Sequence, residues 1–139
     1  MTSDCRILLI SGSLRAASTN TALLRTLIEV SPAGVGAELY DGMGELPHFN
    51  PDADPDGGPV DARVADLRAQ LATADALMLC TPEYAGALPG SFKNLLDWTV
   101  GGMAIQGKAV GWITSRHRLP EPSARTSRSP PFSATSRAA

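Results

Sequence analysis

The sequence has 139 residues, the length of one ordinary domain, and a formal net charge of −2, with both signs spread over the first three quarters of the chain. This charge gives no general attraction to nucleic acid or to acidic lipid surfaces, and neither is expected as a partner. The chain shows no signal-like leader and no uninterrupted apolar stretch of about 18 residues, which predicts a cytoplasmic protein without a membrane span.

Short apolar runs alternate with helical periodicity along residues 1–115, a pattern typical of βαβ units with a parallel sheet. The predicted strands are residues 5–10, 37–40, 76–81 and 109–114, and the predicted helices are residues 19–30, 60–71 and 91–100. Residues 41–59 are rich in Gly, Pro and Asp, which predicts a long surface loop with little regular structure. The expected fold class is α/β, with three layers, α/β/α, around a parallel sheet.

The last 24 residues, 116–139, contain five arginines, five serines and four prolines, but only Leu119 and Phe132 as large apolar residues. So few apolar side chains cannot form a core, and this tail is expected to be disordered. We therefore expect one folded domain over residues 1–115 followed by the tail. The edge of the fourth strand is expected to be bare.

A polar loop, residues 12–20 with the sequence GSLRAASTN, directly follows the first predicted strand and leads into the first predicted helix. A loop in this place exposes backbone N–H groups at the positive end of the helix dipole, which favours a bound anion. Arg15 adds a planar cation that matches phosphate oxygens, and neighbouring hydroxyl groups add neutral donors. An ordinary helix cap by Ser18 or Thr19 is the simpler interpretation, but capping needs one hydroxyl and no arginine. The loop therefore predicts a phosphate site.

A second polar connection, residues 81–98 with the sequence TPEYAGALPGSFKNLLDW, follows the third predicted strand. Pro82 and Pro89 stiffen this connection, Gly86 permits close backbone approach, and Tyr84 offers an aromatic face with a polar tip. Parallel α/β sheets bind ligands beyond the carboxyl ends of their strands, near the point where the strand order reverses. This loop is suited to line a flat ring.

The segments GSLRAASTN and PEYAGALPGSFKNLLDW together resemble the two signature segments of the NADPH-dependent FMN reductase family, flavodoxin-like flavoproteins that include quinone, azo-dye and chromate reductases. The resemblance covers residues 6–113, with both segments in the family's order. It implies a flavodoxin-like fold and an FMN-dependent enzyme that passes hydride from NADPH or NADH to the flavin and on to a quinone, a flavin or a similar acceptor. It also implies a homodimer or a homotetramer, and it requires no catalytic side chain.

The resemblance further implies which residues hold the cofactor. The first loop would hold the FMN phosphate, and the second would lie along the isoalloxazine ring and bond it largely through its backbone. The candidate cofactor-binding residues are Ser13, Leu14, Arg15, Ser18, Thr19, Asn20, Thr21, Pro82, Glu83, Tyr84, Ala85 and Gly86. Ala85 stands where the family often has asparagine, so a bond from that side chain is lost while backbone bonds stay possible.

In the family, the fourth strand is followed by a Ser- and Gly-rich flavin loop, a further helix, a fifth strand and a final helix. None of these is recognisable after Ser115, and the composition of the tail is typical of a premature end or a change of reading frame. A C-terminally shortened relative is therefore expected. Two alternatives stay open beside the enzyme: a flavodoxin-like binding module without turnover, and a defective product that aggregates.

Two other motifs are interpreted as unrelated to catalysis. Residues 102–109, GMAIQGKA, are one residue short of a P-loop, but Ala109 replaces the Mg²⁺-binding Ser or Thr and a strand follows, which excludes nucleotide hydrolysis. His48 and His117 are far apart in the sequence and have no ligand at metal-site spacing, so no metal is expected.

The remaining polar and thiol side chains are expected to be structural. Four residues of the third predicted helix are expected to serve helix packing and a subunit interface: Lys93, Asn94, Asp97 and Trp98. Cys5 and Cys80 each lie at an end of an apolar run, which predicts two buried thiols and no disulfide.

Overall fold

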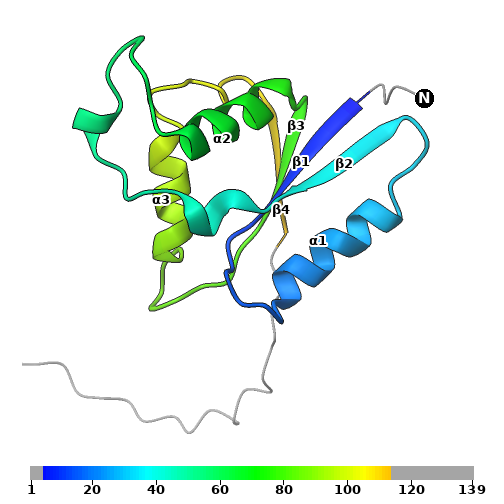
Figure 1. Ribbon diagram of the computed structural model, residues 1–139. Helices are drawn as coiled ribbons and strands as arrows, with labels where there is room; N and C mark the ends of the chain where they lie inside the picture. Colours follow the sequence, from blue (N-terminus) through cyan, green and yellow to red (C-terminus); the bar gives the residue numbers. More distant parts are fainter. Residues whose placement is uncertain (1–4, 114–139) are drawn as a thin grey trace, which may run out of the picture.

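The computed structural model describes residues 5–113 and contains a four-stranded parallel sheet (Figure 1). The strands are β1 (Cys5–Ser11), β2 (Val35–Tyr40), β3 (Ala76–Cys80) and β4 (Ala109–Ile113), and the helices are α1 (Thr19–Glu29), α2 (Ala62–Thr73) and α3 (Gly90–Trp98). Two 3₁₀ turns, η1 (Gly42–Glu45) and η2 (Pro51–Ala53), lie between β2 and α2. The strand order β2-β1-β3-β4 confirms the expected α/β class with a parallel sheet. The predicted tail and the predicted shortening lie outside the described residues.

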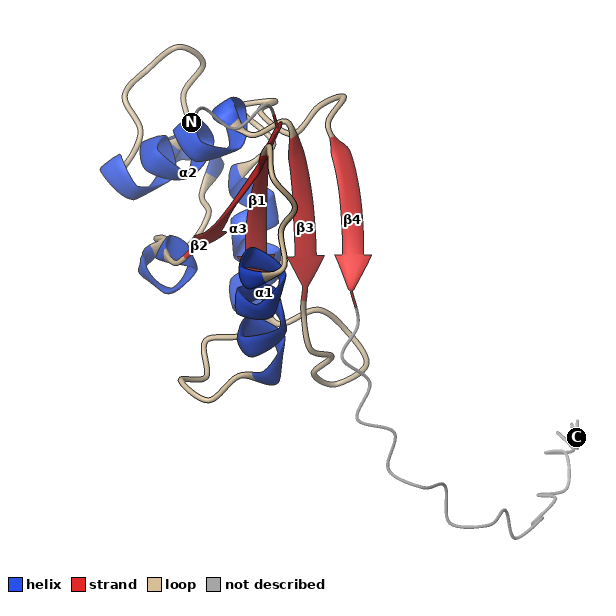
Figure 2. Cartoon of the chain, turned by 90° about the vertical axis from the view of Figure 1, so that its right-hand side faces the viewer, coloured by secondary structure: helices blue, strands red, loops and turns tan. Residues whose placement is uncertain are grey.

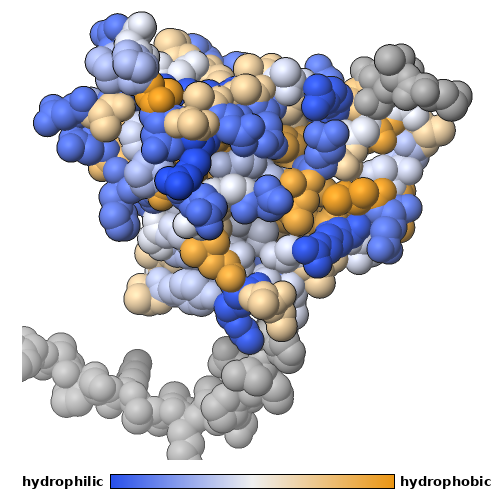
Figure 3. All heavy atoms as spheres, in the orientation of Figure 1, coloured by the Kyte–Doolittle hydropathy of each residue, from blue (hydrophilic) through white to orange (hydrophobic). Residues whose placement is uncertain are grey.

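Different helices cover the two faces of the sheet, with α1 on one side and α2 and α3 on the other (Figures 1 and 2). Leu8 and Leu77 pack in the core beneath α2 and α3. Their strand neighbours point to the opposite face, where Leu9 and Cys80 pack with Leu24 of α1. Strands buried on both faces appear in a sequence as continuous apolar runs, which explains why β1 and β3 are recognisable. Apolar atoms stay visible along the seam between α1 and β2 (Figure 3).

Element boundaries agree closely with the predictions. The predicted helix 60–71 begins instead at Ala62, because Asp61 caps it by accepting the Arg63 N–H through Oδ1 (2.8 Å). The predicted helix 91–100 ends at Trp98, so Val100 lies beyond it with 71% of its surface exposed. Trp98, the last residue of the helix, is buried.

Part of the predicted surface loop, residues 41–59, belongs to the core. Met43 and Leu46 are buried against the same cluster that α2 and α3 cover. The Pro47 carbonyl accepts hydrogen bonds from Asn94 Nδ2 (2.9 Å) and Trp98 Nε1 (2.8 Å) of α3. These bonds place Asn94 and Trp98 in packing, as expected. The surface prediction is wrong for Met43 and Leu46, because the Gly and Pro content around them conceals two isolated apolar residues that tertiary contacts bury.

A partly buried ion pair joins the same segment to α2 and to the end of α3. Arg68 donates to Asp54 through Nη1 (2.8 Å to Oδ1) and Nη2 (2.7 Å to Oδ2), and also to the Trp98 carbonyl through Nε (3.1 Å) and Nη2 (2.9 Å). The two charged side chains are only 18% and 8% exposed. The hydrogen bond from Arg68 holds the pKa of Asp54 below its ordinary value. The pair therefore joins three segments through one guanidinium group.

Neither Cys5 nor Cys80 forms a disulfide. Cys80 is fully buried, whereas Cys5 is only partly buried, so the expected burial is confirmed for Cys80 alone. Within residues 5–113, no helix is both long and apolar enough to cross a membrane. The same residues contain no group of three or more His, Cys, Asp and Glu side chains that could hold a metal ion.

Candidate functional site

The loops that follow β1 and β3 meet at the carboxyl ends of these neighbouring strands. Because β2 lies on one side of β1 and β3 on the other, the strand order reverses at this edge, where parallel α/β sheets bind ligands. The Gly12 N–H donates to the Cys80 carbonyl (2.8 Å). A Cβ built on Gly12 would lie 1.9 Å from Thr81 Oγ1, so only glycine fits there. The two sequence motifs therefore form one continuous surface.

The first loop, residues 12–20, is folded by its own side-chain oxygens. Ser11 Oγ accepts the Ser13 N–H, and Ser13 Oγ accepts the Arg15 N–H, each over a long 3.4 Å. Ser11 Oγ also bonds Thr21 Oγ1 (2.7 Å), which joins the end of β1 to the first turn of α1. Leu14 projects over η1, where a Cβ on Gly44 would lie 3.2 Å from Leu14 Cδ2. The loop is thus held between β1, η1 and α1.

The start of α1 is capped as the simpler sequence interpretation requires. Ser18 Oγ accepts the Thr21 N–H (3.3 Å), so Ser18 is the N-cap residue. Asn20 is only 5% exposed, and its Oδ1 accepts a hydrogen bond from Cys80 Sγ (3.2 Å). The side chain of Asn20 therefore joins α1 to the end of β3. Cap formation and phosphate binding are compatible, because the Ser18 hydroxyl accepts in the cap and still carries a proton to donate.

The accessible polar groups of this loop suit an anion. Arg15 is exposed and forms no ion pair with another residue in the part of the chain that the structure describes. Residues 12–20 include no Asp or Glu, so nothing in the loop repels a negative charge. A surface hollow extends from Ala16 and Ser18 along α1 to Glu29. A phosphate group would meet a cation, hydroxyls and the positive end of a helix dipole here.

The second loop contains a tight turn at residues 84–87. Tyr84 and Ala87 exchange two backbone hydrogen bonds, Tyr84 N–H to Ala87 O (2.9 Å) and Ala87 N–H to Tyr84 O (3.0 Å). Ala85 and Gly86 between them have φ of 51° and 74°, the left-handed values of a type I′ turn. Alanine is an unfavourable residue at such a position, whereas asparagine is among the best tolerated. The turn geometry thus gives a conformational reason why asparagine would suit position 85 better than Ala85 does.

Replacing Ala85 by Asn is expected to raise the free energy of unfolding by about 0.5–1 kcal/mol, because Asn adopts the left-handed conformation at lower cost. Ala85→Val is the matched control and should lower the same quantity, because a β-branched residue is strained at positive φ. Urea unfolding followed by circular dichroism measures both. Equal values for the Asn and Val variants would contradict the turn assignment.

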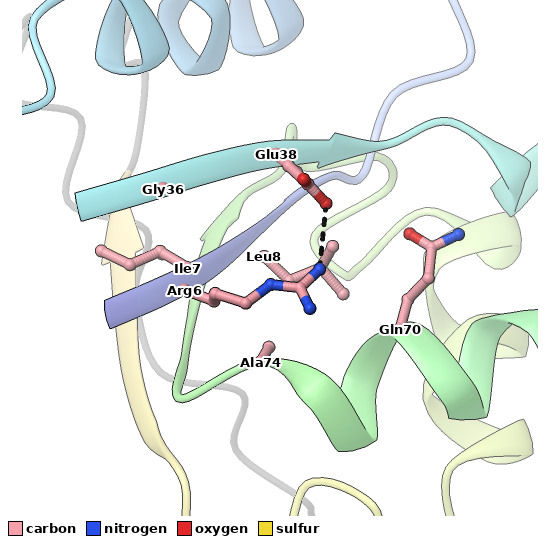
Figure 4. Close-up of a pocket in the computed structure, with 7 residues that line it drawn as sticks. All are labelled: Arg6, Ile7, Leu8, Gly36, Glu38, Gln70 and Ala74. Carbon is pink, nitrogen blue, oxygen red and sulfur yellow. Dashed lines mark hydrogen bonds and ion pairs between the residues drawn. The ribbon is translucent and has the colours of Figure 1, made fainter. Parts of the chain in front are cut away.

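A small hollow at the opposite end of the sheet differs in character (Figure 4). It lies between β1, β2 and the end of α2, and Figure 4 shows Arg6, Glu38 and Gln70 among its lining residues. Its volume of about 10 Å³ accommodates roughly one water molecule. The Arg6–Glu38 pair spans 3.4 Å, with side chains 48% and 68% exposed, and such surface pairs contribute about 0–1 kcal/mol. This hollow is too small for an organic ligand.

The structure places the predicted site residues of both loops at one edge of the sheet, and it adds four residues that the sequence prediction had not assigned to the site. These are Ser11, Gly12, Cys80 and Thr81. Each of them ends a strand or directly follows one, and this position is the only feature of the sequence that could have indicated them. Their partners lie on another element, so the sequence alone does not identify the contacts.

Comparison with known proteins relates the chain to flavin reductases. The model of the family described as NADPH-dependent FMN reductase matches residues 5–120. The chain is 42% identical over 98 residues to an NAD(P)H-dependent FMN reductase of Pseudomonas aeruginosa, an alignment that covers 70% of this chain and 51% of that protein. It is 39% identical over 110 residues to a 2-hydroxy-1,4-benzoquinone reductase of a Burkholderia species, covering 78% of this chain and 58% of that protein.

A solved structure gives the same relationship. The flavoenzyme NAD(P)H:(acceptor) oxidoreductase of Paracoccus denitrificans superposes with a TM-score of 0.70 at 29% identity, covering 79% of this chain and 60% of that one. The chain spans about half the length of the curated relatives it matches.

Proposed function

This chain belongs to the NADPH-dependent FMN reductase family, and from that membership we propose that it binds FMN across the two contacting loops and acts as an NAD(P)H-dependent oxidoreductase. The contact between Gly12 and Thr81 carries the proposal, because it joins a phosphate-suited loop and a ring-suited loop at the edge where the strand order reverses.

The residues of the first loop fit the phosphate of FMN. Arg15 would form charge-assisted bonds to phosphate oxygens, and the hydroxyls of Ser13, Ser18 and Thr19 would donate neutral bonds. The lack of a carboxylate in residues 12–20 favours a dianion. Leu14, Asn20 and Thr21 would keep the loop in place, since they contact η1, β3 and Ser11.

The residues of the second loop fit the isoalloxazine ring. Tyr84 and Ala87 bond each other across the turn, and Ala85 and Gly86 lie at its tip, where we propose that their backbone groups meet the ring. Pro82 and Glu83 lead into the turn. FMN, when bound, supplies the hydride chemistry, and the protein contributes binding, orientation and an open face. No side chain of residues 82–86 is assigned a proton-transfer role.

We further propose a quinone, a flavin or a similar compound as the electron acceptor, with NADPH or NADH as the donor. The names of the Pseudomonas and Burkholderia relatives support this class of substrate. A cytoplasmic location is part of the proposal and is supported by two cysteines that form no disulfide, Cys5 and Cys80. A homodimer or homotetramer is also proposed from the family resemblance, and sedimentation velocity of the purified chain tests it.

The proposed function is tested with the purified full chain. After incubation with FMN and removal of free flavin, we expect yellow protein that consumes NADPH when a quinone is supplied. A chain that retains no FMN would overturn the proposal. FMN retention without NADPH oxidation would instead support a flavin-binding module.

Replacing Arg15 by Ala is expected to weaken FMN binding ten- to a hundredfold, corresponding to about 1.5–3 kcal/mol for a lost charge-assisted bond. Quenching of FMN fluorescence on titration with protein gives the Kd. Arg63→Ala is the control, because Arg63 is an exposed arginine at the start of α2 on the opposite face of the sheet. An unchanged Kd for Arg15→Ala, or an equal loss for both variants, would remove Arg15 from the site.

A further inference from the structure

One buried residue, Cys80, is bonded to both ends of the first loop. Its carbonyl accepts the N–H of Gly12 (2.8 Å), and its Sγ donates to Oδ1 of Asn20 (3.2 Å). Gly12 begins the loop and Asn20 ends it. The last residue of β3 therefore contacts the first loop at its entry and at its exit.

The position of the Cys80 thiol suits a structural role and not a reactive one. Cys80 is 0% exposed and packs with Leu9 and Leu24, so soluble oxidants and electrophiles do not reach it. A buried thiol behaves as a small apolar side chain with a weak donor. At position 80 the apolar part fills the α1-side core, and the donor meets the side-chain oxygen of Asn20, which is itself buried.

Asn20 links the thiol of Cys80 to the start of α1. It is the second residue of α1, so the orientation of its side chain sets how the first turn of the helix lies against β3. The N-cap, Ser18, lies two residues earlier and Arg15 five residues earlier, in the same loop. A rotation of the Asn20 amide would therefore displace the groups that we propose to hold the phosphate.

We infer that Cys80 is a positioning residue of the phosphate subsite: its thiol and carbonyl together hold the loop from Gly12 to Asn20 in the conformation that binds the phosphate of FMN. This inference rests on the proposed function. It assigns Cys80 no contact with the flavin, and its effect reaches the ligand only through the loop.

The test compares FMN with riboflavin, which lacks the phosphate, on variants at position 80. Cys80→Val and Cys80→Ala both remove the donor but change the side-chain volume in opposite directions, whereas Cys80→Ser retains a donor. We expect Val and Ala to weaken FMN binding about three- to tenfold, the size of one lost neutral hydrogen bond, with riboflavin binding changed less than about twofold. Ser should restore the wild-type ratio of the two affinities.

A second arm separates positioning from general stability. In an Asn20→Ala background, Cys80→Val should cause a smaller loss of FMN affinity than in the wild-type chain, because the bond between Cys80 and Asn20 is already absent. Urea unfolding without flavin gives the stability of each variant, and a merely structural role would lower stability and both affinities together. Fluorescence quenching gives the two dissociation constants.

The outcomes are distinct. Wild-type chain that binds neither flavin overturns the proposed function, and this inference with it. Wild-type chain that binds FMN while the Val and Ala variants keep the wild-type ratio of affinities overturns the inference alone. A Ser variant that behaves like Ala overturns it too, because the donor is then irrelevant.

Discussion

The Arg68→Ala variant is expected to have a free energy of unfolding about 1.5–3 kcal/mol below that of the wild-type chain, because the change leaves a partly buried carboxylate without its charged hydrogen-bond partner. Asp54 is only 8% exposed in its side chain, and its two oxygens both accept bonds from Arg68. The Trp98 carbonyl at the end of α3 loses its two bonds from the guanidinium as well. Urea unfolding followed by tryptophan fluorescence measures the loss.

Two control variants test whether the partial burial of the Arg68–Asp54 pair causes the loss of stability. Glu38→Gln breaks the exposed Arg6–Glu38 pair and should change the free energy of unfolding by about 1 kcal/mol or less. Arg68→Lys keeps the positive charge but not the planar guanidinium group, so its free energy of unfolding should lie between those of Arg68→Ala and the wild type. If Arg68→Ala costs no more than Glu38→Gln, the Arg68–Asp54 pair does not fasten residues 41–59 to the core.

The same pair has a pH signature. The pKa of Asp54 is lower in the folded chain than its ordinary value, so the pair stabilises the fold above that ordinary value of about 3.9 and loses its contribution as the pH falls through the folded pKa. The stability of the wild type should therefore drop more steeply than that of Asp54→Asn as the solution is acidified from about pH 5.

Replacing Gly12 by Ala is expected to weaken FMN binding by at least about tenfold and to lower the free energy of unfolding by about 1–3 kcal/mol. The new Cβ would lie 1.9 Å from Thr81 Oγ1 and 2.4 Å from Thr81 Cβ, distances that force the two loops apart. Because both loops are proposed to hold the same flavin, their separation should affect FMN and riboflavin alike. This distinguishes Gly12→Ala from changes in the phosphate subsite.

Gly90 supplies the matched control, because a Cβ built there meets no atom within 4 Å. Gly90→Ala should leave FMN binding unchanged and should not lower stability, since alanine is the better helix former. The double variant Gly12→Ala with Thr81→Gly removes the opposing side chain and should recover most of the lost affinity. Normal FMN binding by Gly12→Ala alone would separate the loop contact from the site.

Much of the site was open to prediction because its signals are local. The phosphate-suited loop is recognisable from a strand, a nine-residue segment that is polar or small except for Leu14, and a helix in direct succession. A cap such as Ser18 is determined by its own neighbours. The turn at Ala85 and Gly86 is also local, although its left-handed backbone became evident only in the structure.

The sequence by itself determined the strands and helices, the two loops and the family, since apolar runs, helical spacing and motif order all depend on neighbouring residues. Tertiary structure alone decided that Gly12 touches Thr81, that Cys80 holds Asn20 across 60 positions, and that Arg68 binds Asp54. Met43 and Leu46 are buried for the same reason. These contacts join elements distant in the chain, and their formation depends on the stacking of strands and helices, for which one sequence contains no direct signal.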